Sequence, residues 1–234
     1  AVALHQTPTR THPQARPTAV SRIIARLTNP PALPMNAQIE TAELHGQPVL
    51  KLQTPDGAVA LISLFGAQVL SWVPAGGEDR LYLSPDAVFD GATPIRGGVP
   101  LCFPQFAGRG PLPKHGFART RQWEVGNTRA GKDFALATLR LTDDATTRAL
   151  WPHAFSAEMS ISIGGDRLDL ELELAARFVE RGQCVQLDAH SLYKAKGDEL
   201  GPRAVHHAAY LGGFIAQAEV EVAGYGTGQA GYLA

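Results

Sequence analysis

Short apolar and alternating runs, separated by Gly, Pro and Asp, follow one another from about Gln47 to Leu174. Runs of this length, rich in β-branched and aromatic residues and bounded by turn residues, are typical of strands. The runs read VLKLQ, AVALISLFGAQVLSW, FALATLRL, FSAEMSISI and RLDLELEL. The pattern therefore predicts an all-β fold.

Two neighbouring runs alternate most clearly. Every second residue from Phe155 to Ile163 is apolar, with Ser or Glu between, and Leu alternates with Asp and Glu from 168 to 174. The intervening Gly164-Gly165-Asp166 is typical of a tight turn. One face of this hairpin is expected to face solvent, which indicates an antiparallel sandwich or barrel rather than a doubly wound α/β fold.

One helical turn is predicted from Thr142 to Leu150. Thr142 can cap it, Asp143 and Asp144 favour the positive end of the helix dipole, and Pro152 stops it. No other stretch of ten or more residues has a convincing helical period. We therefore expect very little helix.

Residues 1–39 lack Asp and Glu, carry four Arg and are interrupted by six Pro. An Arg-rich, acid-free leader is typical of an organelle transit peptide, but prolines disrupt the amphipathic helix that such peptides form. Residues 1–34 are therefore interpreted as a disordered or spurious extension before a start at Met35. Residues 35–234 are expected to form the folded domain.

Composition limits the partners. The 234 residues are 44% hydrophobic and 18% charged, with a formal net charge of −1. No apolar run approaches the ~20 residues of a membrane span, and a near-neutral chain has no global attraction to nucleic acid. Cys102 and Cys184 have neither disulfide nor zinc spacing, which favours the cytoplasm, and Cys102 is expected to be a small buried apolar residue.

The interval between Asp90 and Glu124 contains no acidic residue. Its cationic and titratable side chains are Arg96, Arg109, Lys114, His115, Arg119 and Arg121. Solvated faces usually intersperse both signs of charge, and the many Gly and Pro residues indicate a loop. Because binding residues concentrate on loops of a rigid β scaffold, this interval predicts a local anion site.

The other residues of the interval point to a polyol. Gly97-Gly98 are expected to let the backbone approach a ligand, and the prolines stiffen the loop before binding. Arg96 and Arg119 offer planar guanidinium groups suited to a phosphate or to vicinal hydroxyls. Four aromatic side chains are either apolar faces for a sugar ring or core residues: Phe103, Phe106, Phe117 and Trp123. A small anionic polyol is the indicated ligand.

Three blocks of the interval carry a family resemblance: PIRGGVP (94–100), FPQF (103–106) and LPKHGFAR (112–119), followed by Trp123. Together they resemble the signature of the glucose-6-phosphate 1-epimerases, the hexose-6-phosphate mutarotases of the aldose-1-epimerase superfamily. The likeness runs from about Met35 to Leu174. It implies a galactose-mutarotase-like β-sandwich that interconverts the α and β anomers of a hexose 6-phosphate, with no metal and no organic cofactor.

The resemblance also implies roles for single residues. By their place in the three blocks, Arg96, Lys114, His115 and Arg119 are expected to bind the substrate. Lys114 stands where the family usually has Gln; it keeps hydrogen-bond donors and adds charge, but loses the acceptor of the amide. The expected partner is a hexose 6-phosphate, and the expected state is a monomer.

Anomer interconversion removes the proton of the C1 hydroxyl and protonates the ring oxygen, so that the ring opens, C1 rotates and the ring recloses. A His acid and a carboxylate base suit these transfers. The family uses a His in a strand resembling His-(Thr/Ser)-Tyr, with a Glu close to the C-terminus. His190, in DAHSLYK (188–194), resembles a scrambled form of that motif and is the predicted catalytic residue. His153 is expected to be structural, and the adjacent His206 and His207 are a weak metal pair.

After Leu174 the resemblance and the alternation fade, and no Glu stands in a context like that of the family's base. The available carboxylates are Glu180, Glu199, Glu219 and Glu221. We therefore expect a truncated or frame-shifted coding sequence beyond about residue 174. Two alternatives to an enzyme stay open: a non-catalytic sugar-phosphate-binding sandwich and an inactive truncated fragment.

Overall fold

The computed structural model describes residues 35–108, 110–180, 183–196, 214–215, 219–222 and 225–229. Beyond residue 175 it describes the strands and not their side chains. The predicted extension 1–34 lies outside the described residues. No helix in the described part of the chain is both long and apolar enough to cross a membrane.

The first sheet has four antiparallel strands in chain order: β1 (Gln38–Leu44), β2 (Gln47–Gln53), β3 (Val59–Ser63) and β4 (Gln68–Val73). Every residue of β3 is buried, whereas β1 at the edge is mostly exposed. A strand that is covered on both faces has no reason to alternate. This explains the continuous apolar run in the sequence of β3.

The second sheet has five antiparallel strands in the order β10-β9-β8-β7-β6. They are β6 (Glu124–Ala130), β7 (Ala135–Thr142), β8 (Ala154–Gly164), β9 (Arg167–Glu180) and β10 (Gln183–Lys196). The predicted hairpin is β8–β9, in which Met159 pairs with Leu172 and Glu158 with Glu173. Met159 and Leu172 are buried while Glu173 is exposed, so one face meets the core and the other meets solvent.

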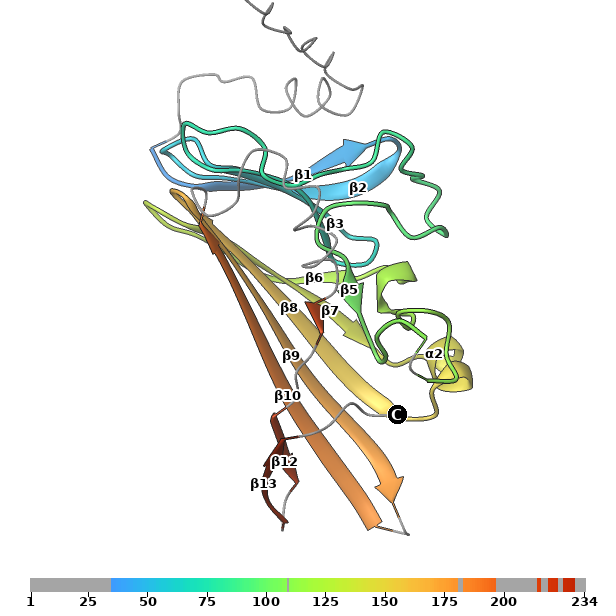
Figure 1. Ribbon diagram of the computed structural model, residues 1–234. Helices are drawn as coiled ribbons and strands as arrows, with labels where there is room; N and C mark the ends of the chain where they lie inside the picture. Colours follow the sequence, from blue (N-terminus) through green and yellow to red (C-terminus); the bar gives the residue numbers. More distant parts are fainter. Residues whose placement is uncertain are drawn as a thin grey trace, which may run out of the picture.

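One hydrophobic core joins the two sheets, which lie at an angle to each other (Figure 1). The same cluster of buried side chains includes Leu52 and Trp72 of the first sheet and Leu139, Ile161 and Leu170 of the second. Each fully buried side chain of this size stabilises the fold by about 1.5–3 kcal/mol. The antiparallel all-β fold predicted from the sequence is confirmed.

The remaining elements are short. Three of them lie together on one side of the second, five-stranded sheet (Figure 1): β5 (Leu101–Cys102), the 3-10 turn η1 (Ala118–Thr120) and α2 (Ala145–Leu150). β5 pairs in parallel with β11 (Phe214–Ile215), and β12 (Glu219–Val222) pairs with β13 (Tyr225–Gln229). The side on which β5 and η1 lie therefore carries the segment expected to bind a ligand.

The predicted helical turn is α2, but Asp144 caps it rather than Thr142. The Asp144 carboxylate accepts the N–H of Thr147 at 2.7 Å, and the Thr147 hydroxyl accepts the N–H of Asp144 at 2.8 Å. This reciprocal pair is a capping box. Thr142 ends β7 and pairs with Ser156, so its backbone belongs to the sheet and the helix begins later than predicted.

The outer strands of the two sheets meet at one place. The N–H of Ala37, just before β1, donates to the carbonyl of Gly131, just after β6, at 2.9 Å. Every residue of β6 is exposed, and its pairing with β7 is interrupted by a bulge between Val125 and Thr128.

Candidate functional site

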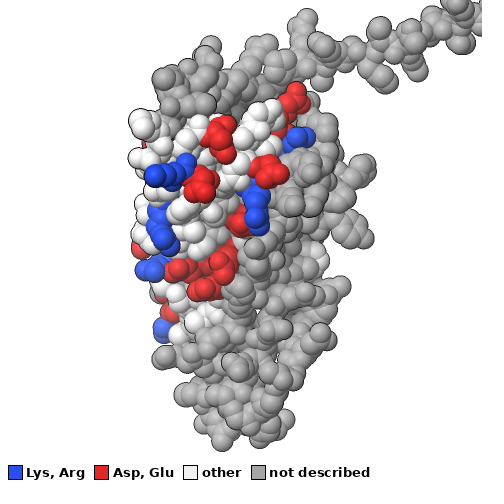
Figure 2. Space-filling model, turned by 90° about the vertical axis from the view of Figure 1, so that its left-hand side faces the viewer, with Lys and Arg blue, Asp and Glu red and all other residues white. Residues whose placement is uncertain are grey.

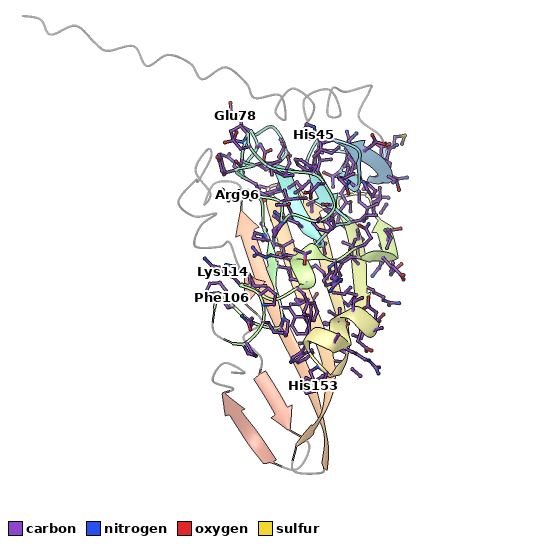
Figure 3. All side chains as sticks on the ribbon, turned by 90° about the vertical axis from the view of Figure 1, so that its right-hand side faces the viewer. His45, Glu78, Arg96, Phe106, Lys114 and His153 are labelled. Carbon is purple, nitrogen blue, oxygen red and sulfur yellow. The ribbon has the colours of Figure 1, made fainter. Side chains whose placement is uncertain are left out.

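The acid-free segment (residues 91–123) is a loop held on the β scaffold, as predicted. In its described part, β5, η1 and isolated bridges such as Val69–Val99 interrupt its irregular course. Figure 3 shows Arg96, Lys114 and Phe106 following one another along the same side of the molecule. The segment holds its cations at two places, the turn around Arg96 and the arm from Lys114 to Arg119.

Hydrogen bonds to three successive backbone carbonyls fix the turn around Arg96. The buried Gln68 of β4 donates its Nε2 to the carbonyls of Ile95, at 3.2 Å, and Gly97, at 2.5 Å. The carbonyl of Arg96 accepts the N–H of Ser84 at 3.1 Å. The Arg96 side chain is exposed, so a rigid turn presents a flexible cation to solvent.

The two glycines beside Arg96 pack tightly against the backbone of the scaffold, and their part in the approach of a ligand stays a prediction. Gly97 and Gly98 have φ of 108° and 59°, in the left-handed region that favours glycine. A Cβ at Gly97 would lie closer than 3.0 Å to the Tyr82 carbonyl oxygen, and one at Gly98 would meet that of Val69 equally closely. The space that a side chain would need is therefore occupied by neighbouring backbone.

The arm from Lys114 to Arg119 brings three predicted binding residues together. The Nη2 of Arg119, on η1, donates to the carbonyl of Lys114 at 2.8 Å. The N–H of the intervening His115 donates to the carbonyl of Ala107 at 2.9 Å. Lys114 is exposed, while His115 and Arg119 are half-buried. Nε of Arg119 has no hydrogen-bond partner among the described residues.

The surroundings of His115 determine where its proton lies. Its Nδ1 accepts the N–H of Ala107 at 3.2 Å and lies 3.2 Å from the Cys102 sulfur. Because a backbone N–H only donates, Nδ1 is unprotonated and the neutral ring carries its hydrogen on Nε2. Partial burial lowers the pKa of His115, and the charges of Arg119 and Lys114 lower it further. His115 is therefore an uncharged donor at neutral pH.

Cys102 is buried, as expected for a small apolar residue. Burial raises the pKa of its thiol to about 11, although the Arg119 charge acts in the opposite direction. The thiol therefore stays protonated at neutral pH and is a poor nucleophile.

Of the four aromatic residues of the segment, three belong to the core and one is accessible. Phe103, Phe117 and Trp123 are buried, and Phe103 packs edge-on against Phe155 with ring centroids 5.3 Å apart. These three side chains are core. Phe106 is half-buried, and its ring lies edge-on to His115 at 5.2 Å. Phe106 is thus the ring of this set that stays accessible beside the cations.

The cations of the segment have no acidic partner in the described part of the chain. The ion pairs found there join Lys51 to Glu40, Arg140 to Glu158 and Arg148 to Asp143. On the side of the molecule shown in Figure 2, basic and acidic side chains are interspersed, as on an ordinary solvated surface. Among the described cations of the acid-free segment, no such mixing of charge sign is present.

His190 lies in β10, directly opposite Glu173 of β9. Its side chain lies outside the described residues, as do Arg109 and the side chains of the four candidate carboxylates. Its catalytic role therefore stays a prediction. His153 packs its ring against Trp151 at 4.6 Å. Among the described residues, no group of three or more His, Cys, Asp or Glu side chains is placed to hold a metal ion.

Sequence reasoning missed two buried glutamines that hold the segment. Gln68 fixes the turn around Arg96, and Gln105 bonds to the arm between Ala107 and Pro113. A single Gln has no period or spacing, so the sequence carried no signal for either role. Both became visible only once their backbone partners were placed.

Comparisons with known proteins identify the family of the chain. The aldose 1-epimerase family model matches residues 48–200, more than half of the chain. A candidate glucose-6-phosphate 1-epimerase from Escherichia coli strain K12 is 40% identical over 115 residues, which cover 48% of this chain and 39% of the relative. One from Cenchrus ciliaris is 39% identical over 112 residues, covering 45% and 33%. The chain thus spans well under half the length of these curated relatives.

A solved structure supports the fold. The crystal structure of a candidate mutarotase (YeaD) from Salmonella typhimurium is 28% identical, with a TM-score of 0.58, and the match covers 72% of this chain and 57% of that one. Sequence and fold lead to the same group of proteins. The chain belongs to the aldose 1-epimerase family.

Proposed function

We propose that this chain binds a hexose 6-phosphate on the acid-free segment and interconverts its α and β anomers. One observation carries the proposal: Lys114, His115 and Arg119 gather on a preformed loop without acidic partners, in a member of the aldose 1-epimerase family. The names of the E. coli and C. ciliaris relatives point to glucose 6-phosphate as the substrate class.

The binding groups divide between the phosphate and the sugar. In this proposal, Arg96 and Arg119 donate charged hydrogen bonds to phosphate oxygens, and Lys114 adds a third cation. His115 donates from Nε2 to a sugar hydroxyl, because its Nδ1 already accepts the Ala107 N–H. A neutral donor suits a hydroxyl better than a phosphate.

The proposed reaction needs two proton transfers. His190 gives a proton to the ring oxygen while a carboxylate takes the proton of the C1 hydroxyl, and the bond between C1 and the ring oxygen breaks to give the open-chain aldehyde. After rotation about C1 the transfers run in reverse and the ring closes. The groups then hold the protons with which they began, so neither a metal nor an organic cofactor is needed. We assign no residue as the base.

We further propose a monomer that acts in the cytoplasm. The absence of disulfide spacing between Cys102 and Cys184 supports this location.

Catalysed loss of the anomeric excess of fresh α-glucose 6-phosphate, followed by NMR or polarimetry, tests the proposal. Acceleration that falls about 100-fold or more in His190→Gln supports the enzyme and the assigned acid. The exposed His45 at the β1–β2 turn provides the matched control, His45→Gln, which should keep the rate. An enzyme that is unaffected by His190→Gln would refute the assignment of the acid.

A non-catalytic sugar-phosphate-binding sandwich is the second candidate. It is favoured by the cationic segment, in which Lys114, His115 and Arg119 lie together, and by a sequence in which no Glu stands in a context like that of the family's base. Binding of glucose 6-phosphate without acceleration of its mutarotation would support this candidate over the enzyme.

A further inference from the structure

Gln105 is a buried amide that bonds to both ends of the arm 107–113. The residue is 7% exposed. Nε2 lies 3.2 Å from the carbonyl oxygen of Ala107, 3.0 Å from that of Leu112 and 3.4 Å from that of Pro113. Oε1 accepts the N–H of Leu112 at 3.0 Å. One side chain thus ties the start of the arm to its end.

The partners determine the orientation of this amide. Three carbonyl oxygens can only be matched by the NH2 group, and the N–H of Leu112 can only be matched by Oε1. A Glu at position 105 would have the same shape, but it would set a carboxylate oxygen against three carbonyl oxygens. Gln105→Glu therefore removes the donors while it changes the volume very little.

The arm that Gln105 closes is the one that contacts His115. Ala107 accepts from the His115 N–H at 2.9 Å and donates to His115 Nδ1 at 3.2 Å, so the two residues form a closed pair. Both have left-handed backbone, with φ of 53° at Ala107 and 69° at His115. This conformation is unfavourable for residues with a Cβ. It therefore depends on the surrounding hydrogen bonds, including those of Gln105.

Gly110 leaves room for the amide. A Cβ built at Gly110 would lie 2.5 Å from Oε1 of Gln105, whereas one built at Gly108 meets nothing within 4 Å. Neither residue has a φ in the left-handed region. Two glycines of the same arm therefore differ in whether a methyl group would displace Gln105.

We propose that Gln105 is a positioning residue of the sugar-phosphate site, whose amide closes the arm 107–113 and thereby holds His115 with Nε2–H as its free donor. The effect on ligand binding rests on the proposed function, whereas the effect on the His115 ring does not. Without Gln105, the closing of the arm would have to accompany each binding event and would weaken the complex.

Nitrogen-detected or nitrogen-edited NMR of the imidazole rings tests the effect on His115 directly. The chain has eight histidines, and the ring signal that disappears in His115→Asn is assigned to His115. In the intact chain the ring should show protonated Nε2 and unprotonated Nδ1. In Gln105→Glu and Gly110→Ala we expect a mixture of tautomers and a higher pKa of His115, because release of the arm exposes the ring.

Affinity for glucose 6-phosphate, measured by calorimetry, is the second readout. We expect it to fall about tenfold in Gln105→Glu and Gly110→Ala. Gly108→Ala is the matched control and should change neither the ring spectrum nor the affinity. If Gln105→Glu fails to unfold cooperatively, Gly110→Ala carries the test, because it displaces the amide without burying a charge.

The outcomes separate the two proposals. An unchanged His115 spectrum and unchanged affinity in cooperatively folded Gly110→Ala would overturn the positioning role. A changed spectrum in this variant, together with an intact chain that does not bind glucose 6-phosphate, would support the action of Gln105 on His115 and overturn the proposed function. Changes of the same size in Gly108→Ala would show a general loosening of the loop and would also overturn the positioning role.

Discussion

Replacing Arg96 by Ala isolates the contribution of one cation to phosphate binding. Its side chain is exposed and makes no hydrogen bond to described residues, while the turn is held by hydrogen bonds to the carbonyls of Ile95, Arg96 and Gly97. The substitution should therefore leave the free energy of unfolding within about 0.5 kcal/mol of the original value. Because the fold is then almost unchanged, a loss of binding free energy larger than this value comes from the lost charge.

The expected loss of affinity follows from the value of a charged hydrogen bond. Removing one such bond costs about 1.5–3 kcal/mol, which raises the Kd for glucose 6-phosphate roughly 10- to 150-fold. Because the site is exposed, the difference should shrink when the ionic strength is raised from 0.01 to 1 M, where the Debye length falls from about 30 to about 3 Å. Arg119→Ala should weaken binding at least as much, since it also releases the Lys114 carbonyl.

Calorimetric titration with glucose 6-phosphate, inorganic phosphate and glucose provides the assay. The loss should appear with the two phosphate ligands and disappear with glucose, because the missing partner is the phosphate. Arg129→Ala, an exposed cation on β6 outside the segment, is the matched control and should bind as the unmodified chain does. Unchanged phosphate affinity in both Arg96→Ala and Arg119→Ala would refute the proposed site.

Two further predictions concern stability. Gly116 has a φ of 69°, and a Cβ there would lie closer than 3.0 Å to the Phe103 carbonyl oxygen; Gly116→Ala should therefore destabilise the fold by roughly 3 kcal/mol or more. Gly46→Ala, with a φ of 78° and nothing within 4 Å, should lose only about 1 kcal/mol, and similar urea midpoints for the two variants would contradict the steric argument. Hydrogen bonding by the Thr146 hydroxyl is the main cause that lowers the pKa of Asp144 from 3.8 to about 2. This lowered pKa stabilises the fold above pH 3.8 and the contribution is lost as the pH falls towards 2, so urea midpoints of Asp144→Asn should lack that part of the acid dependence.

Much of the fold could be predicted because alternation is a local property. The strict alternation from Phe155 to Leu174 leaves one arrangement of the β8–β9 hairpin that buries every Leu and Ile, and that hairpin is observed. The cap of α2 was misplaced because Thr142 and Asp144 are both good caps. Thr142 is excluded as the cap only by its pairing with Ser156 across the sheet.

The residues of the candidate site could be chosen from the sequence, but the contacts that support them could not. Charge and the three sequence blocks single out Lys114, His115 and Arg119, which the structure brings together, while their role in binding stays a prediction. The function of Gly98 depends on Val69, and that of Gln105 depends on Leu112, whose positions become known only in three dimensions. Such contacts have no period in the sequence.

The bulge in β6 has a consequence for association between copies of the chain. An exposed outer strand with regular backbone can pair with the same strand of another molecule and start an aggregate. In β6 the irregularity between Val125 and Thr128 breaks the regular spacing of donors and acceptors, and the exposed Arg129 follows at once. The edge of the five-stranded sheet that β6 forms is therefore a poor template for another strand.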